Sequence, residues 1–146
     1  MKKSERALLG DRNRRRFFRH ACDASVRGAF EYDRNEKWDR RVRQGYLKSE
    51  IVAQSHMRVL NISEGGIALI SRFPMVKGAV AFLKVETAFG TTIRARARVC
   101  WVKRMKTMTD AYAVGFEFSE MSREDARGLS SLLKTLQKRL PQQKLS

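Results

Sequence analysis

The second half of the chain alternates apolar and polar residues with a period of two. In residues 91–104 one face would carry Ile93, Ala95, Ala97, Val99 and Trp101. The other face would carry Arg94, Arg96, Arg98 and Cys100, and we expect its arginines to form a solvated face or to extend a positive surface toward a ligand or a partner. Because side chains alternate across a β-strand, this pattern predicts a half-buried strand. Similar composition predicts strands over 79–87 and 111–119, and Phe89 and Gly90 suit a hairpin turn before residue 91.

Strand signals in the first half are weaker. Residues 20–32 and 47–60 have strand-like composition with imperfect alternation, and residues 67–71 form a short apolar run. The intervening NISEGG, residues 61–66, is typical of a turn between two apolar segments. Residues 33–46 are dense in charge and contain Trp38, so they predict a long loop or a short helix.

Near the C-terminus the apolar period changes from 2 to 3.6. One helical face would carry Leu129, Leu132, Leu133, Leu136 and Leu140. Ser122 and Asp125 have the spacing of a capping box, and Pro141 would end the helix. We expect the apolar face to cover one end of a β-structure rather than to bind a partner. The patterns together predict a mainly β fold, a small barrel or sandwich, closed by one amphipathic helix.

The net positive charge of the chain indicates what class of ligand it could bind. The chain has 146 residues, which suits one domain, and 31 Lys and Arg against 15 Asp and Glu leave a net charge of +16. Such an excess favours phosphate-bearing partners, namely nucleic acid, nucleotides or anionic lipid, although a solvated basic surface is the simpler alternative. Residues 1–20 hold eight basic and two acidic residues, which predicts a flexible basic arm.

Several classes of function lack their motifs. The two cysteines, Cys22 and Cys100, are far apart and have no histidines at ligand spacing, so we expect reduced thiols and no zinc site. No GxSxG, HExxH, P-loop or GxGxxG motif occurs, and we do not expect an enzyme. No apolar run resembles a signal peptide or reaches the about 20 residues of a membrane span. We therefore expect a soluble, cytoplasmic protein without a cofactor.

Two short motifs remain. Arg15 and Arg19 form an RxxxR spacing in the basic arm, and Asn61, Ser63 and Gly66 form an NxSxxG spacing in the turn. In this order, with a β-rich body and a terminal helix, they resemble the PilZ domain family of bacterial cyclic di-GMP receptors. The resemblance covers roughly residues 12–119 and the helix. The ARVCWV and YAVGFEF segments, residues 97–102 and 112–118, also resemble the family's strands.

The resemblance implies a six-stranded, antiparallel, Greek-key-like β-barrel with a C-terminal amphipathic α-helix. It implies a flexible arm over residues 1–13, the barrel over 14–119, and the helix and tail over 120–146. The path from Arg19 to Asn61 is longer than is usual in the family, so residues 33–46 are interpreted as an insertion within the barrel.

The resemblance also implies how cyclic di-GMP would be bound. Arg15 and Arg19 would meet guanine edges with paired hydrogen bonds, because a guanidinium matches the O6 and N7 acceptors. Arg14 would add a contact, and in the family an arginine there accompanies a stacked pair of ligand molecules.

The turn would complete this site. Asn61 and Ser63 would hydrogen-bond a base or phosphate, and the alternative is that both bond their own turn. Gly66, with a positive φ, would admit the ligand close to the backbone, and Gly65 would do the same or simply complete the turn. Phe17 and Phe18 would anchor the arm on the barrel.

The expected function is that of a receptor. The ligand would order the basic arm over the barrel and change the surface offered to an unidentified downstream protein in motility, adhesion or exopolysaccharide control. The alternative is a nucleic-acid-binding small basic β-barrel, which the net charge and the Arg-rich strand favour. The aromatic residues are not arranged as a repeated stacking platform, which disfavours this alternative.

Overall fold

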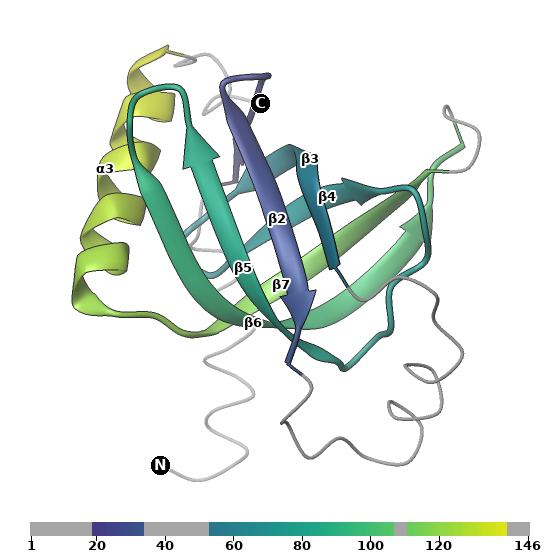
Figure 1. Cartoon of the computed structure of the whole chain (residues 1–146). Coiled ribbons are helices and arrows are strands. Elements are labelled where there is room, and N and C mark those ends of the chain that lie inside the picture. Colours follow the sequence, from purple (N-terminus) through teal and green to yellow (C-terminus); the bar gives the residue numbers. More distant parts are fainter. Residues whose placement is uncertain (1–18, 34–52, 107–110, 140–146) are drawn as a thin grey trace, which may run out of the picture.

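The computed structural model describes residues 19–33, 53–106 and 111–139. Its strands are β1 (His20–Ala21), β2 (Val26–Tyr32), β3 (Ala53–Ile62), β4 (Gly66–Ser71), β5 (Val80–Thr87), β6 (Thr92–Arg104) and β7 (Tyr112–Glu120), followed by the helix α3 (Arg123–Arg139) (Figure 1). The predicted arm, residues 1–13, lies outside the described residues, as do residues 34–46 of the predicted insertion.

Six antiparallel strands close into a barrel. The hydrogen-bonded order is β3-β2-β5-β6-β7-β4, and β4 pairs again with β3. The chain passes from β4 to β5 without pairing them, as in a Greek key. Closure leaves none of these six strands with an open edge. The predicted six-stranded barrel is confirmed, and the two-residue β1 is an extra strand that pairs with the end of β3, on the same edge as β2.

The barrel interior is built by alternation along each strand. In β2 the buried positions recur every second residue from Val26 to Tyr32. The β5–β6 hairpin turns at Gly90, whose φ of 85° suits glycine, as the sequence predicts. Tyr32 reaches across the interior and its hydroxyl accepts a 2.9 Å hydrogen bond from the amide of Val76. The interior is therefore a largely apolar core in which the Tyr32 hydroxyl has a hydrogen-bond partner.

Strand β6 departs from its predicted alternation at Trp101. Ile93, Ala95, Ala97 and Val99 are buried as expected, but Trp101 is 37% exposed. Val99 lies opposite Phe116 and Trp101 opposite Gly115, so Cys100 is an extra residue relative to β7. A β-bulge of this kind reverses which face the following side chains occupy. The prediction that Trp101 faces inward is therefore wrong.

The arginine face of β6 is also less uniform than predicted. Arg94 and Arg98 are exposed, as a solvated face requires. Arg96 is half-buried instead, and its Nη2 and Nε lie 3.0 and 3.1 Å from Oδ2 of the buried Asp33. Its Nη1 is 3.7 Å from Glu120. The interpretation of Arg96 as part of a solvated face is therefore wrong, since this ion pair ties the end of β2 to β6.

Helix α3 covers the barrel with the predicted apolar face. Leu129, Leu132, Leu133 and Leu136 are all buried and join the barrel core, while Leu140 and Pro141 lie outside the described residues. Figure 1 shows the helix lying along one side of the barrel, beside β6. None of the described helices is long and apolar enough to cross a membrane.

Ser122 caps α3 as predicted, although its side chain rather than its backbone amide bonds the Asp125 carboxylate, and Asp125 also attaches α3 to β6. The amide of Asp125 donates to the Ser122 hydroxyl at 3.0 Å, and that hydroxyl donates back to Oδ2 at 2.6 Å. Oδ1 accepts a 2.9 Å hydrogen bond from the amide of Arg94. These bonds, the one from Ser122 first, hold the pKa of Asp125 below its ordinary value.

Truncation of the helix face should destabilise the whole barrel. We expect Leu136→Ala to lower the free energy of unfolding by about 2–5 kcal/mol, because a fully buried leucine loses its contacts and leaves a cavity. Urea denaturation measures this, with the exposed Lys134→Ala on the same helix as the matched control. Equal stabilities for the two variants would mean that the apolar face is not part of the core.

Candidate functional site

A pocket of about 410 Å³ lies where the β3–β4 turn meets β6 and β7. Five of the seven predicted site residues line it: Arg19, Asn61, Ser63, Gly65 and Gly66. The other two, Arg14 and Arg15, lie outside the described residues, as do Phe17 and Phe18. The fold thus gathers residues that are some forty positions apart in the sequence.

The short strand β1 is what brings the two motifs together. His20 pairs with Ile62 and Ala21 pairs with Asn61, so Arg19 lies beside the start of the turn. The amide of Cys22 extends the pairing with a 3.0 Å hydrogen bond to the Leu60 carbonyl. The Cys22 side chain is buried, and burial, with a smaller contribution from the charge of Asp23, raises the pKa of its thiol to about 12. Cys22 is thus an unreactive anchor for β1.

The hydroxyl of Ser63 is used within its own turn. It accepts hydrogen bonds from the amides of Gly65 at 3.2 Å and Gly66 at 3.3 Å. The Ser63 amide donates to the Gly66 carbonyl at 2.9 Å, and the side chain is buried. This is the alternative that the sequence left open for Ser63. Its first role is to shape the turn, and a direct contact with a ligand stays a prediction.

The predicted conformation of Gly66 is wrong. The only described residues with a positive φ are His56, Gly78 and Gly90. Gly66 is instead required by packing, because a Cβ there would collide with the carbonyl oxygen of Phe116 on β7. The absence of this side chain lets β4 lie close to β7 and leaves the floor of the pocket open.

Two polar side chains in the pocket keep their hydrogen-bonding capacity. The side-chain amide of Asn61 is half-buried and forms no hydrogen bond with the described residues. The guanidinium of Arg19 is exposed and has no ion pair within the described part of the chain. A half-buried amide without a partner is costly unless a ligand or water satisfies it. The pair therefore presents donors and an acceptor to whatever occupies the pocket.

Sequence reasoning did not assign four further pocket residues to the site, namely Cys100, Trp101, Gly115 and Glu117. The bulge at Cys100 turns Trp101 outward, where its indole lies over Gly115; a Cβ on Gly115 would collide with the ring. The Cys100 thiol, half-buried, lies 3.5 Å from Oε2 of Glu117. The alternation of apolar and polar residues does not predict a bulge. A glycine within the strand segment YAVGFEF does indicate that another group, here the Trp101 ring of the neighbouring strand, packs closely against it.

The pocket therefore combines an open guanidinium, an open amide, an exposed indole and one carboxylate. These groups can bind a planar ring by its face and its edges and can attract an anionic group attached to it. No side-chain set of a catalytic kind lies among the described lining residues.

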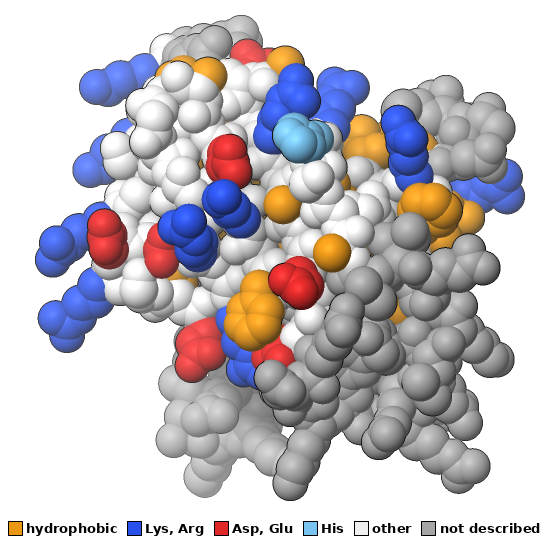
Figure 2. Space-filling model, in the orientation of Figure 1, with side chains coloured by type: hydrophobic (Ala, Val, Ile, Leu, Met, Phe, Trp, Pro, Cys, Tyr) orange, Lys and Arg blue, Asp and Glu red, His pale blue; other side chains and the backbone are white. Residues whose placement is uncertain are grey.

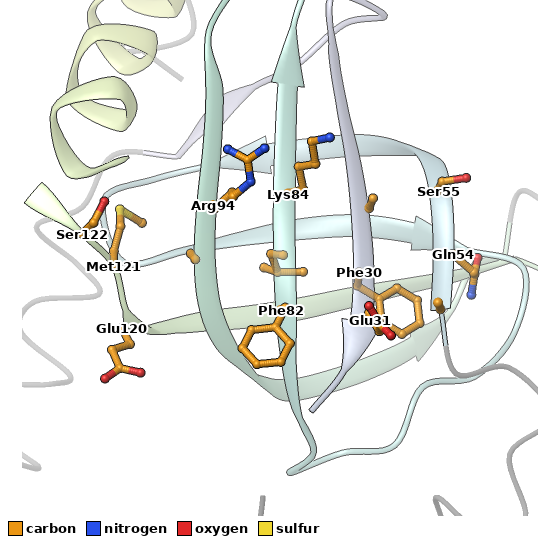
Figure 3. Close-up of a pocket in the computed structure, with 14 residues that line it drawn as sticks. Phe30, Glu31, Gln54, Ser55, Phe82, Lys84, Arg94, Glu120, Met121 and Ser122 are labelled. Atoms are coloured by element: carbon orange, nitrogen blue, oxygen red, sulfur yellow. The ribbon is translucent and has the colours of Figure 1, made fainter. Parts of the chain in front are cut away.

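A larger groove of about 920 Å³ lies elsewhere, over the outer face of β2, β5 and β6 and the entry to α3 (Figure 3). It contains none of the predicted site residues. Phe82 is 50% exposed and lies in this groove, with Lys84 and Arg94 above it in the view and with Glu31 and Glu120 on opposite sides of it. Its charged groups are dispersed along the rim, so size alone does not make it the site.

The surface charge is spread over the face of the molecule seen in Figure 1. Figure 2 shows Lys and Arg side chains scattered over the described part of this face, with acidic side chains between them. The described part of this face carries no continuous basic track of the kind that follows a nucleic-acid backbone.

Solved structures with similar folds include two that contain c-di-GMP. The PilZ domain of YcgR from Escherichia coli, solved with c-di-GMP, gives a TM-score of 0.60 at 15% identity over 90% of this chain and 97% of that one. YcgR itself, in complex with c-di-GMP, gives 0.61 at 15% identity over 90% and 49%. The inhibitor of motility MotI/DgrA from Bacillus subtilis gives 0.58 at 18% identity over 86% and 51%.

These identities show a shared fold, and this chain spans about half the length of YcgR and of MotI. A search of curated protein sequences finds no match. The family model described as the PilZ domain matches residues 13–135, which include both motifs, every barrel strand and most of α3. The chain belongs to the PilZ domain family.

Proposed function

We propose that this protein is a cyclic di-GMP receptor, not an enzyme, and that it acts through a protein partner. The observation that carries the proposal is the single pocket in which Arg19 meets the NISEGG turn. The structures of YcgR and of its PilZ domain, both solved with c-di-GMP on the same fold, support it.

The free groups of the pocket match the ligand. Cyclic di-GMP carries two guanines and two phosphates, and a guanidinium can meet the O6 and N7 acceptors of guanine with two parallel hydrogen bonds. Arg19 supplies one such fork, and Arg15 supplies the second from the same motif. Asn61 hydrogen-bonds a base edge, and Arg14 contacts a second ligand molecule stacked on the first.

Trp101 offers an aromatic surface on which the face of a guanine can lie, while the other groups bond the edges of the base. Its indole is held over Gly115 and is exposed to the pocket, where a guanine can stack on it. Stacking of a base on an aromatic side chain contributes about 1–3 kcal/mol. Trp101 therefore joins Arg14, Arg15, Arg19, Asn61, Ser63, Gly65 and Gly66 as a proposed ligand-binding residue.

Binding would be coupled to output through the arm. Residues 1–20 carry eight basic side chains, whose mutual repulsion the ligand phosphates would relieve. We propose that the arm then orders over the barrel, with β1 as the fixed point from which it extends. The reordered surface would engage a downstream protein in motility, adhesion or exopolysaccharide control.

Calorimetric titration with cyclic di-GMP tests the binding proposal. We expect binding at micromolar concentrations or tighter. Arg19→Ala should weaken it by roughly 5- to 150-fold, because a bidentate arginine–guanine pair is worth about 1–3 kcal/mol. Arg58→Ala, an exposed arginine of β3 outside the pocket, should bind as the wild type does.

Absence of heat in the wild type would refute the receptor proposal. A steep salt-dependent affinity for oligonucleotides in its place would favour the nucleic-acid alternative. Two ligands per chain support the role of Arg14, and one ligand per chain contradicts it.

The stacking role of Trp101 is tested separately. Trp101→Ala should weaken cyclic di-GMP binding by roughly 5- to 150-fold, while Trp101→Phe should retain most of the affinity. Phe82→Ala removes an aromatic residue that is outside the pocket and more exposed than Trp101, and it should have no effect. If Trp101→Ala and Phe82→Ala bind equally well, no base stacks on Trp101.

Ordering of the arm is tested by amide hydrogen exchange. Exchange in residues 10–20 should slow when cyclic di-GMP is added, because new backbone hydrogen bonds or burial protect amides. Residues of α3 serve as the internal reference. Unchanged exchange in 10–20, with binding intact, would reject the ordering of the arm.

A further inference from the structure

The pocket contains an acidic side chain, Glu117, which would repel a phosphate rather than attract it. Among the described residues that line it, Glu117 is the only acid. A carboxylate beside a ligand with two negative charges weakens binding unless it meets hydrogen-bond donors on that ligand. The other proposed side-chain contacts are hydrogen-bond donors, an amide and the aromatic face of Trp101. The carboxylate of Glu117 therefore needs its own explanation.

The position of Glu117 leaves its carboxylate open to the pocket. Its side chain is exposed on the outer face of β7, directly opposite Gly66 in the β4–β7 register. Gly66 has no side chain, so β4 offers nothing to cover the carboxylate. The backbone is fixed by the 2.9 Å hydrogen bond from the Phe118 amide to the Gly65 carbonyl. Glu117 is thus held at a defined place beside the turn.

Little within the described structure engages the carboxylate. Its recorded partner is the Cys100 thiol at 3.5 Å, which is a weak donor, and no ion pair with a described residue reaches it. Arg98 lies directly opposite Glu117 in the β6–β7 pairing but forms no ion pair with it. An ionised carboxylate accepts several hydrogen bonds, so most of this capacity remains available.

We propose that Glu117 is a specificity-determining residue that reads the N1–H and N2–H₂ edge of a guanine. This inference rests on the proposed function. Guanine offers two adjacent donors on that edge, and one carboxylate can accept from both in parallel. Arginine reads the opposite edge, so Arg and Glu together would recognise the whole base. Adenine presents an acceptor at N1 and no 2-amino group, and Glu117 would repel it.

The test compares two ligands that differ only in the 2-amino group of the base. Cyclic di-GMP and its inosine analogue, cyclic di-IMP, share phosphates, ring and the O6 and N7 edge, but the analogue lacks the 2-amino group. Calorimetry should show the wild type preferring cyclic di-GMP by about tenfold or more. In Glu117→Ala and Glu117→Gln this ratio should fall below about threefold. Glu31→Gln, an exposed acid on β2 outside the pocket, should keep the wild-type ratio.

The outcomes separate this inference from the function on which it rests. If the wild type binds cyclic di-GMP but the Glu117 variants keep the wild-type ratio, the reading of the base edge is refuted and the receptor stands. If the variants bind both ligands more tightly by the same factor, Glu117 acts only through its charge and the inference is overturned. If the wild type binds neither ligand, the receptor proposal and this inference both fail. Thermal melting of each variant controls for folding, since Glu117 is exposed.

Discussion

The pairing of β1 with β3 is the constraint on which the site depends. Two residue pairs, His20 with Ile62 and Ala21 with Asn61, place the end of the RxxxR motif beside the NxSxxG turn. The buried Cys22 and the contact of α3 with β1 hold this short strand in place. Without that pairing Arg19 would belong to a basic tail, and the pocket would lose its described guanidinium.

The closed barrel provides a rigid support for this junction, and its irregularities shape the pocket. The bulge at Cys100 turns Trp101 out of the core, and Gly115 leaves room for the ring. Gly66 lets β4 approach β7 and leaves Glu117 uncovered. These two irregularities lie at the pocket, where one side chain is reoriented and another is absent, and β-bulges are common near binding sites.

Much of this arrangement follows from sequence patterns, and the exceptions have physical reasons. Alternation and the leucine period predicted the strands and the covering helix, because both depend on burial along a single element. Trp101, Arg96 and the φ of Gly66 were predicted wrongly, since each depends on a neighbouring strand: a bulge against β7, the ion pair with Asp33, and the carbonyl of Phe116. Glu117 had no signal beyond its place between two phenylalanines.

The central claim is that the junction of β1 with the β3–β4 turn is a cyclic di-GMP site. The most direct test is a crystal structure of the protein with this ligand. We expect a guanine within hydrogen-bonding distance of Arg19 and Asn61, with its face on Trp101. A ligand bound in the groove around Phe82, with the junction empty, would contradict it.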